Sequence, residues 1–197
     1  IVIWIGRTLS IIYIVMINLS NLIHWNKKVL DLSLCENLCE YADITCKNKG
    51  EVTDKTKSFT RNVLVYKFFK TKQDELYKSI ILQQLVPLVQ KYKNEFSFIY
   101  DLEMDDMNLL MYKPGCYYHP HVDYSAQTPR NLSIILNLND AYEGGELIFF
   151  SPINQDVLEK ITLGVGDVCI FPSNFLFPHA ISKINKGIRY SVITWLK

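Results

Sequence analysis

Two histidines and an aspartate in the C-terminal half have side-chain types and a spacing that suit metal binding. His121 and Asp123 are two positions apart, and in an extended strand residues i and i+2 point to the same face. His179, in the segment Phe-Pro-His-Ala, offers a second imidazole. Two histidines and one carboxylate leave the other positions of a metal open, which suits non-haem Fe(II). No cysteine lies at ligand spacing, so nothing in the pattern argues for zinc.

The sequence around these residues resembles the Fe(II)/2-oxoglutarate-dependent dioxygenases, specifically their prolyl 4-hydroxylase-like branch. The matching segments follow the family's order across residues 105–197. They are Tyr112-Lys-Pro-Gly115, His121-Val-Asp123, Tyr142-Glu-Gly-Gly-Glu-Leu147, Gly166-Asp-Val-Cys-Ile-Phe-Pro172, Pro178-His179 and Gly187-Ile-Arg-Tyr-Ser-Val-Ile-Thr-Trp195. A lone His-x-Asp pair would be a weak indication, because it occurs by chance in many chains, whereas the ordered series is a strong one. The N-terminal half matches more loosely.

The resemblance implies Fe(II), 2-oxoglutarate and O2 as cofactors, with ascorbate as the reductant. It implies hydroxylation of a C–H bond, coupled to decarboxylation of 2-oxoglutarate to succinate and CO2. The substrate implied by this branch is a prolyl residue in a peptide or protein. Two alternatives stay open: a non-protein substrate such as an amino acid, lipid or nucleobase, and a non-catalytic jelly-roll module that binds metal or peptide. The intact ligand set argues against the module, because a protein that has lost catalysis has usually lost a ligand.

Arg189 is the candidate for binding the second cofactor. The turn Asn185-Lys-Gly187 separates it from His179, so the two are predicted on adjacent strands of a hairpin. A planar guanidinium can hold a carboxylate with two parallel hydrogen bonds. By resemblance, Arg189 binds the distal carboxylate of 2-oxoglutarate and Tyr112 is a second contact to it. Ser191 shares a face with Arg189 by the two-residue period and is predicted to add a hydrogen bond.

Collagen is a less favoured substrate, because collagen-type prolyl hydroxylases carry lysine where this chain has Arg189. Two further residues beside the metal motif, His119 and Tyr124, are predicted to line the substrate pocket or its rim. His119 would share a face with His121 in a straight strand, but the resemblance places iron at His121. The polar loop 124–130 is interpreted as a flap that closes over the substrate.

Short apolar segments after Phe96, separated by Gly, Pro, Asn and Asp turns, predict the fold that positions these residues. The predicted strands are 107–113, 117–123, 131–138, 146–151, 159–163, 167–171, 178–184 and 188–196. Such a series is typical of a sandwich or a barrel. Closed jelly rolls of this class, cupins included, can hold a small ligand between two sheets. Together with the resemblance, this gives the predicted fold class: α+β, mainly β, with a double-stranded β-helix (jelly-roll, cupin-like) core and N-terminal helices packed on its outside.

A single domain is predicted for residues 20–197, with helical support at 20–100 and the jelly-roll core at 101–197. The first predicted supporting elements are a strand at 23–30 and a helix that starts at the capping box of Ser33 and Glu36. One face of that helix carries Leu34, Leu38 and Ala42. An exposed loop at 47–60, a strand at 61–69 and a helix capped by Thr71 and Asp74 are predicted to follow. Pro87 is expected to kink or divide the last helix, because proline removes a backbone donor.

Residues 1–19 are mostly apolar and are predicted to lie outside the fold. Arg7, Thr8 and Ser10 interrupt the run, so no uninterrupted apolar stretch is long enough to span a bilayer. The run has neither a charged region before it nor a clear cleavage site. Together with the lack of an initiator Met, these features favour a fragment or an over-extended reading frame, with Met16 as a candidate for the natural start. A signal anchor is the alternative.

Charge and cysteine content bear on partners and location. With 21 basic and 20 acidic residues, the chain gives no electrostatic case for binding nucleic acid or a membrane surface. Its five cysteines are odd in number and include no Cys-x-x-Cys, so neither a disulfide scaffold nor a structural zinc site is expected. Reduced thiols favour a cytoplasmic location. A signal-anchored protein of the endoplasmic reticulum is the alternative if residues 1–19 are genuine.

Overall fold

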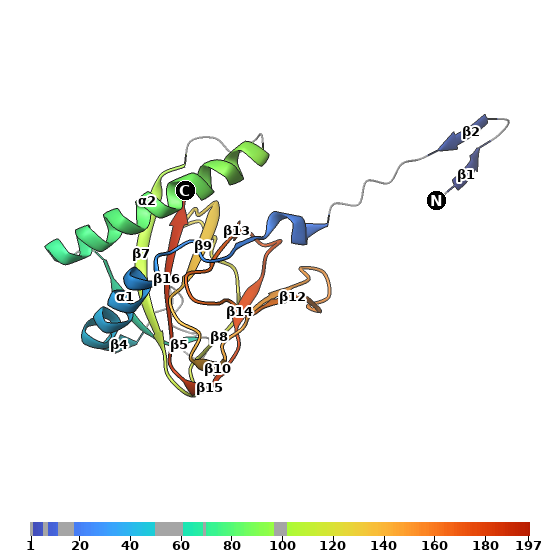
Figure 1. Cartoon of the computed structure of the whole chain (residues 1–197). Helices are drawn as coiled ribbons and strands as arrows, with labels where there is room; N and C mark the ends of the chain where they lie inside the picture. Colours follow the sequence, from blue (N-terminus) through green and yellow to red (C-terminus); the bar gives the residue numbers. More distant parts are fainter. Residues whose placement is uncertain (1, 6–7, 12–17, 50–60, 69, 97–101) are drawn as a thin grey trace.

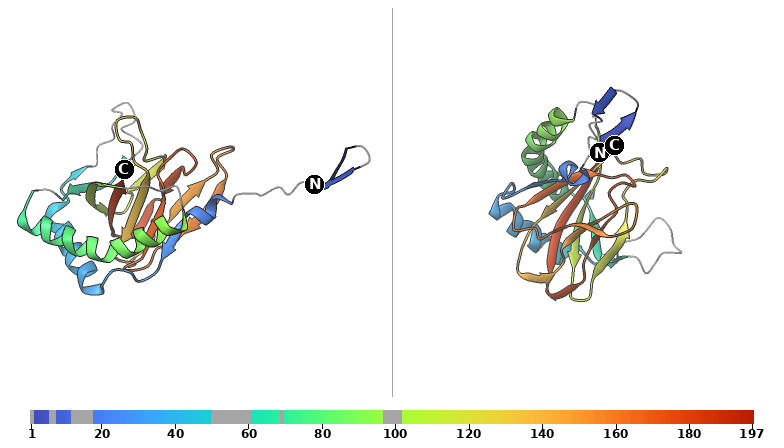
Figure 2. Two further views of the ribbon diagram at one scale, coloured as in Figure 1. Left: turned by 90° about the horizontal axis from the view of Figure 1, so that it is seen from above. Right: turned by 90° about the vertical axis from the view of Figure 1, so that its right-hand side faces the viewer.

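A computed structural model describes residues 2–5, 8–11, 18–49, 61–68, 70–96 and 102–197. Two antiparallel sheets face each other, and the two long helices lie on the outer side of the larger sheet (Figures 1 and 2). This is the predicted jelly-roll arrangement of the α+β, mainly β class. The predicted start of the domain at residue 20 stays a prediction, and Met16 lies outside the described residues.

The larger sheet has seven strands in the order β3-β13-β9-β16-β7-β6-β4. Their bounds are β3 His24–Asn26, β13 Val168–Pro172, β9 Leu132–Asn137, β16 Arg189–Leu196, β7 Met104–Tyr112, β6 Leu64–Lys67 and β4 Asn48–Lys49. β9 and β16 are buried along their whole length. Strands covered on both faces carry apolar residues at successive positions, as Leu-Ser-Ile-Ile-Leu in β9 does.

The smaller sheet has the order β12-β11-β14-β8-β5. Its strands are β12 Val157–Ile161, β11 Leu147–Phe150, β14 His179–Ile181, β8 Tyr117–His121 and β5 Arg61–Asn62. Two further pairs are β10 Tyr142–Gly144 with β15 Ile184–Gly187, and β1 Val2–Ile5 with β2 Thr8–Ile11. The predicted strand 178–184 divides between β14 and β15. β10 was not predicted, because it is short and ends in a glycine with positive φ.

The helices pack on the outer face of the larger sheet, opposite the smaller one (Figure 2). Helix α1 spans Leu32–Thr45 and buries Leu34, Leu38 and Ala42, the face that the sequence predicted. Its predicted cap at Ser33 is wrong. The helix begins at Leu32, and Asp31 occupies the N-cap position without a side-chain hydrogen bond.

Helix α2 spans Lys72–Glu95 and begins with the predicted capping box. The Thr71 hydroxyl accepts from the backbone N–H of Asp74 at 3.1 Å, and the Asp74 carboxylate accepts from the backbone N–H of Thr71 at 2.8 Å. Of the two predicted effects of Pro87, a kink or a division, the structure excludes the division, because the proline lies inside one continuous helix. Proline has no N–H, so the carbonyl of Gln83, one turn earlier, has no partner within the helix. Gln83 and Pro87 are both exposed, so water can solvate that carbonyl.

Parts of the N-terminal half differ from the prediction or fall outside the described residues. The predicted strand 61–69 is two strands, β5 and β6, in different sheets. Most of the predicted loop 47–60 lies outside the described residues, and its described part contributes β4. A 3-10 turn at Leu19–Leu22 precedes β3. No helix in the described part of the chain is long and apolar enough to cross a membrane.

Candidate metal centre

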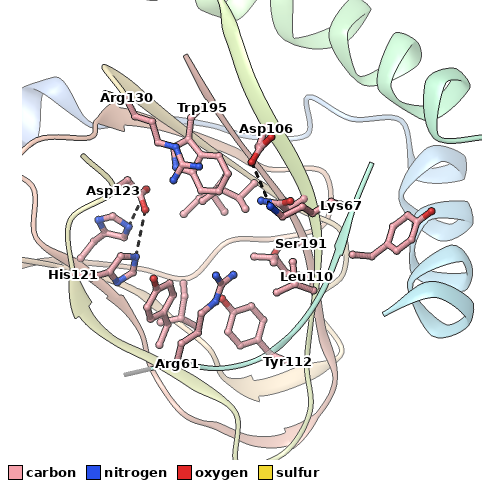
Figure 3. Close-up of a pocket in the computed structure, with 18 of the residues that line it drawn as sticks. Arg61, Lys67, Asp106, Leu110, Tyr112, His121, Asp123, Arg130, Ser191 and Trp195 are labelled. Carbon is pink, nitrogen blue, oxygen red and sulfur yellow. Dashed lines mark ion pairs between the residues drawn. The ribbon is translucent and has the colours of Figure 1, made fainter. Parts of the chain in front are cut away.

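The three predicted metal ligands meet at one point between the sheets. His121 ends β8, and His179 begins β14 directly opposite it in the antiparallel register. Asp123 follows two residues after His121, and its carboxylate lies 3.6 Å from His121 Nε2 and 3.5 Å from His179 Nε2 (Figure 3). All three ligand atoms lie within 4.8 Å of one another. The predicted spacing therefore does bring an imidazole, a carboxylate and a second imidazole together.

Both histidines present Nε2 to this point. The Nδ1 atoms of His121 and His179 lie 2.9 and 3.0 Å from the carbonyl oxygens of His119 and Phe177. A carbonyl only accepts, so each Nδ1–H donates and each neutral ring keeps its lone pair on Nε2. Burial lowers the pKa of His179 to about 4, which keeps this ring neutral at physiological pH.

Asp123 is ionised and held in a fixed orientation. Burial would raise its pKa, but the neighbouring His179 and His121 outweigh burial and hold the pKa well below its usual range. Ser133 donates to Oδ2 at 2.7 Å, and the hydroxyls of Ser133 and Ser173 are 2.7 Å apart. The backbone N–H of Asp123 also donates to the carbonyl of Ser173 at 3.2 Å. Such supporting bonds orient a metal ligand.

The donor set fits a metal of the non-haem Fe(II) type. Two neutral imidazole nitrogens and one carboxylate oxygen converge, and all three residues line a cavity of about 520 Å³. Positions on the cavity side of a bound ion would therefore be open to small molecules. The cavity lies between the sheets and is walled mainly by the inner faces of β7, β16, β6 and β8.

Arg189 lies in the wall of the same cavity, at the start of β16 and paired with Tyr112 of β7. The side chain is 1% exposed. Nη1 donates to Ser191 Oγ at 3.1 Å, as predicted for that serine, whereas Nε and Nη2 have no hydrogen-bond partner within the described structure. A buried cation with unpaired donors is unfavourable, so the site fits a carboxylate that would satisfy them. A dicarboxylate such as 2-oxoglutarate meets that need.

Tyr112 supports the same end of the cavity. It is 1% exposed, and its ring centroid lies 5.4 Å from the Arg189 guanidinium carbon. Burial raises the pKa of Tyr112, although the cations Arg61 and Arg189 oppose this shift. Its hydroxyl therefore stays protonated and can donate to an anion.

His119 and Tyr124 do not line the cavity; both are exposed. A register irregularity between β8 and β14 means that β8 is not the straight strand in which His119 would share a face with His121. Tyr118 takes that place instead, stacked on the His121 ring with centroids 3.5 Å apart. From the predicted flap, Thr128 and Arg130 reach the cavity.

Sequence reasoning missed several residues of the cavity wall. Trp195 shares the inner face of β16 with Arg189 and Ser191, so the two-residue period could have identified it. Arg61 lies opposite Tyr118 across the β5–β8 pair, with its guanidinium carbon 4.9 Å from the tyrosine ring centroid. No local signal predicts that pairing. Figure 3 shows the Arg61 side chain pointing into the cavity.

Comparison with known proteins gives consistent matches. The family profile of the 2OG-Fe(II) oxygenase superfamily matches residues 107–197. A PKHD-type hydroxylase of Prochlorococcus marinus (strain MIT 9301) is 33% identical over 85 residues, which cover 41% of this chain and 36% of the relative. A PKHD-type hydroxylase of Xylella fastidiosa (strain 9a5c) is 27% identical over 116 residues, covering 59% and 46%. The chain thus spans less than half the length of these relatives.

Solved structures with a similar fold cover most of the chain. A Pseudomonas putida prolyl-4-hydroxylase superposes with a TM-score of 0.69 at 18% identity, covering 89% of this chain and 92% of that one. A Trichoplax adhaerens prolyl hydroxylase, in complex with a hypoxia inducible factor peptide fragment, superposes with a TM-score of 0.74 at 16% identity, covering 90% and 84%. At these identities the likeness concerns the fold.

Proposed function

We propose that this chain is an Fe(II)- and 2-oxoglutarate-dependent hydroxylase of the prolyl 4-hydroxylase-like branch of the 2OG-Fe(II) oxygenase superfamily, whose family profile matches residues 107–197. Membership in the superfamily implies Fe(II), 2-oxoglutarate and O2 as cofactors. One observation carries the proposal. A metal-binding set of two histidines and a carboxylate shares a cavity with a buried guanidinium, Arg189, that has unpaired donors.

In this proposal His121, Asp123 and His179 hold the iron. When bound, the iron supplies the O2 chemistry that converts 2-oxoglutarate to succinate and CO2 and converts a C–H bond of the substrate to C–OH. Arg189 and Tyr112 hold the distal carboxylate of 2-oxoglutarate. The bond from Ser191 fixes one edge of the Arg189 guanidinium, so that the other donors face the ligand. The surrounding sheets keep bulk water away from the reacting centre.

The proposed substrate is a prolyl residue in a peptide or protein. Its support is the fold shared with prolyl hydroxylases, one of them solved with a peptide. A free amino acid, lipid or nucleobase is the competing substrate class.

The first test is an anaerobic titration of the protein with Fe(II) and 2-oxoglutarate, followed by the visible charge-transfer band of the bound pair. The band is expected in the parent, lost in His179→Ala and weakened in Arg189→Ala. Admission of O2 in the presence of ascorbate should then yield succinate, with more succinate when a proline-containing peptide is added. A folded, metal-loaded parent without the band would refute the dioxygenase proposal and favour a binding module.

A further inference from the structure

The cavity extends well beyond the proposed cofactor site. A five-carbon diacid held between Arg189 and the metal ligands occupies only one end of the roughly 520 Å³. The other end lies over the inner face of the larger sheet, where β7, β6 and β4 contribute Asn108, Asp106, Lys67 and Asn48. This outer part of the cavity is the space that remains for a substrate.

The wall of the whole cavity carries more positive than negative charge. Arg61, Lys67, Lys70 and Arg130 line the cavity, and apart from the metal ligand Asp123 the one carboxylate among its described lining residues belongs to Asp106. Two of these cations have acidic partners. Arg130 Nε donates to Asp105 at 3.1 Å, and Lys67 Nζ lies 3.7 Å from Asp106 (Figure 3). Counting both pairs as neutral still leaves the charges of Arg61 and Lys70 among the described residues.

The ion pair between Lys67 and Asp106 is also weak, so another carboxylate can replace Asp106 beside Lys67. Its side chains are 63% and 40% exposed, and ion pairs with such exposure contribute little to stability. A substrate carboxylate could therefore compete for Lys67 at small cost. Lys70 lies nearby on the same wall, with its Nζ 5.9 Å from the ring centroid of Tyr66.

One observation favours a peptide over a nucleic acid as the anionic ligand. Single-stranded nucleic acid uses open aromatic faces for base stacking. Here the Arg130 guanidinium carbon lies 3.4 Å from the centroid of the Trp195 ring, and His121 and Arg61 both lie against the Tyr118 ring. These two aromatic faces of the cavity are therefore already covered.

We propose that the substrate is an acidic peptide, in which an Asp or Glu side chain close to the hydroxylated residue lies against Lys67 and Lys70. The inference rests on the proposed function and names the substrate class for the same site. Lys67 and Lys70 set the charge preference, while the metal ligands and Arg189 serve the cofactors.

The test uses three fluorescein-labelled peptides of equal length with one central proline, flanked by Glu, Gln or Lys. Binding is followed by fluorescence anisotropy with the full chain, under anaerobic conditions, with Fe(II) and 2-oxoglutarate and again without them. The Glu peptide should bind about tenfold more tightly than the Gln peptide at low salt, as expected for two partly exposed ion pairs. The Lys peptide should bind most weakly. Added salt should reduce the Glu preference, because it screens exposed charges.

Two double variants separate local contact from overall charge. Lys67→Gln with Lys70→Gln should bring the Glu-to-Gln affinity ratio close to one without weakening the Gln peptide. Lys183→Gln with Lys186→Gln makes the same change in net charge at two exposed positions that do not line the cavity, so it should keep the tenfold preference.

The outcomes distinguish this inference from the proposed function. Equal affinity for the Glu and Gln peptides, in protein that shows the Fe(II)–2-oxoglutarate band, would overturn the acidic-peptide inference and leave the hydroxylase proposal intact. Absence of the band would defeat the hydroxylase proposal, while the cofactor-free peptide ratio would still test Lys67 and Lys70. A labelled single-stranded RNA that binds more tightly than the Glu peptide, and loses affinity in the Lys67/Lys70 variant, would identify the wall as a nucleic-acid surface instead.

Discussion

Arg189→Met is expected to abolish 2-oxoglutarate binding and, at the same time, to stabilise the protein when no 2-oxoglutarate is present. The side chain is 1% exposed, and among the residues that the structure describes only Nη1 of its guanidinium group has a partner, Ser191. In the ligand-free protein this charge is therefore buried without full compensation. Methionine has a similar length and no charge, so it can fill the same space with less strain than a truncation would cause.

The structure sets the size of both effects. Hydrogen bonds to a charged group contribute about 1.5–3 kcal/mol each, so losing the two from Nε and Nη2 costs about 3–6 kcal/mol of 2-oxoglutarate binding. That is a loss of affinity of at least about a hundredfold. In the ligand-free protein the two unsatisfied buried donors cost about 2–6 kcal/mol, and the loss of the Nη1–Ser191 bond offsets about 1.5–3 kcal/mol of the gain from removing them. The variant should therefore gain roughly 1–3 kcal/mol of unfolding free energy.

Urea unfolding of the metal-loaded protein, with and without 2-oxoglutarate under anaerobic conditions, measures both quantities. At a hundred times its dissociation constant, 2-oxoglutarate should raise the unfolding free energy of the parent by about 2.7 kcal/mol and that of Arg189→Met hardly at all. Arg130→Met is the matched control, because it removes a cavity guanidinium that is already paired with Asp105 and should keep the full rise. Two results together would show that Arg189 is a structural residue. In the absence of 2-oxoglutarate, Arg189→Met would be less stable than the parent, and 2-oxoglutarate would still stabilise the variant.

Three other substitutions have expected outcomes that require no substrate. His179→Ala should weaken metal binding more than a hundredfold in equilibrium dialysis with Co(II), and stoichiometric metal in the variant would contradict its assignment as a ligand. Ser133→Ala removes the 2.7 Å bond to Asp123 and should weaken metal binding about 10- to 100-fold with the fold intact by circular dichroism; unchanged affinity would mean that backbone contacts alone orient Asp123. Asp74→Asn should destabilise the protein by about 2–4 kcal/mol, because the buried carboxylate accepts from two tyrosine hydroxyls and two backbone N–H groups. Burial would raise the pKa of Asp74, but these bonds outweigh it and lower the pKa, so the parent should lose this contribution as the pH falls below about 4. Urea unfolding at pH 3–7 should then show a smaller pH dependence in the variant than in the parent, and equal slopes would refute the assignment.

The metal ligands could be predicted because part of their geometry is local. His121 and Asp123 need only an extended backbone to share a face, and the sequence around them predicts a strand. The ligand His179 depends on strand pairing, but the family-like motif around it made up for the missing long-range information. The structure places it directly opposite His121. Arg189 and Ser191 followed from the same two-residue period on one strand.

The errors arise where neighbouring chain segments decide the outcome. In a straight strand His119 would lie beside His121, but the irregular pairing of β8 with β14 brings Tyr118 to that position. Arg61 and Lys67 enter the cavity because β5 and β6 join different sheets, and a single run of β-forming residues could not predict this division. At the start of α1, Asp31 and Ser33 both have favourable N-cap side chains, so local preference could not choose between them.

The inner face of β16 shows why function concentrates at one end of this sandwich. Along that face Arg189 and Ser191 are followed by Ile193 and Trp195, and all four are buried. A sandwich core built for stability alone would carry apolar side chains at the first two positions as well, as the outer face of the same strand does with Val192. Two polar residues in a buried row cost stability unless they are satisfied, and Arg189 is satisfied only in part. Such a violation of core patterning is expected where a ligand completes the interior. The unpaired donors of Arg189 thus argue for an anionic ligand independently of any family resemblance.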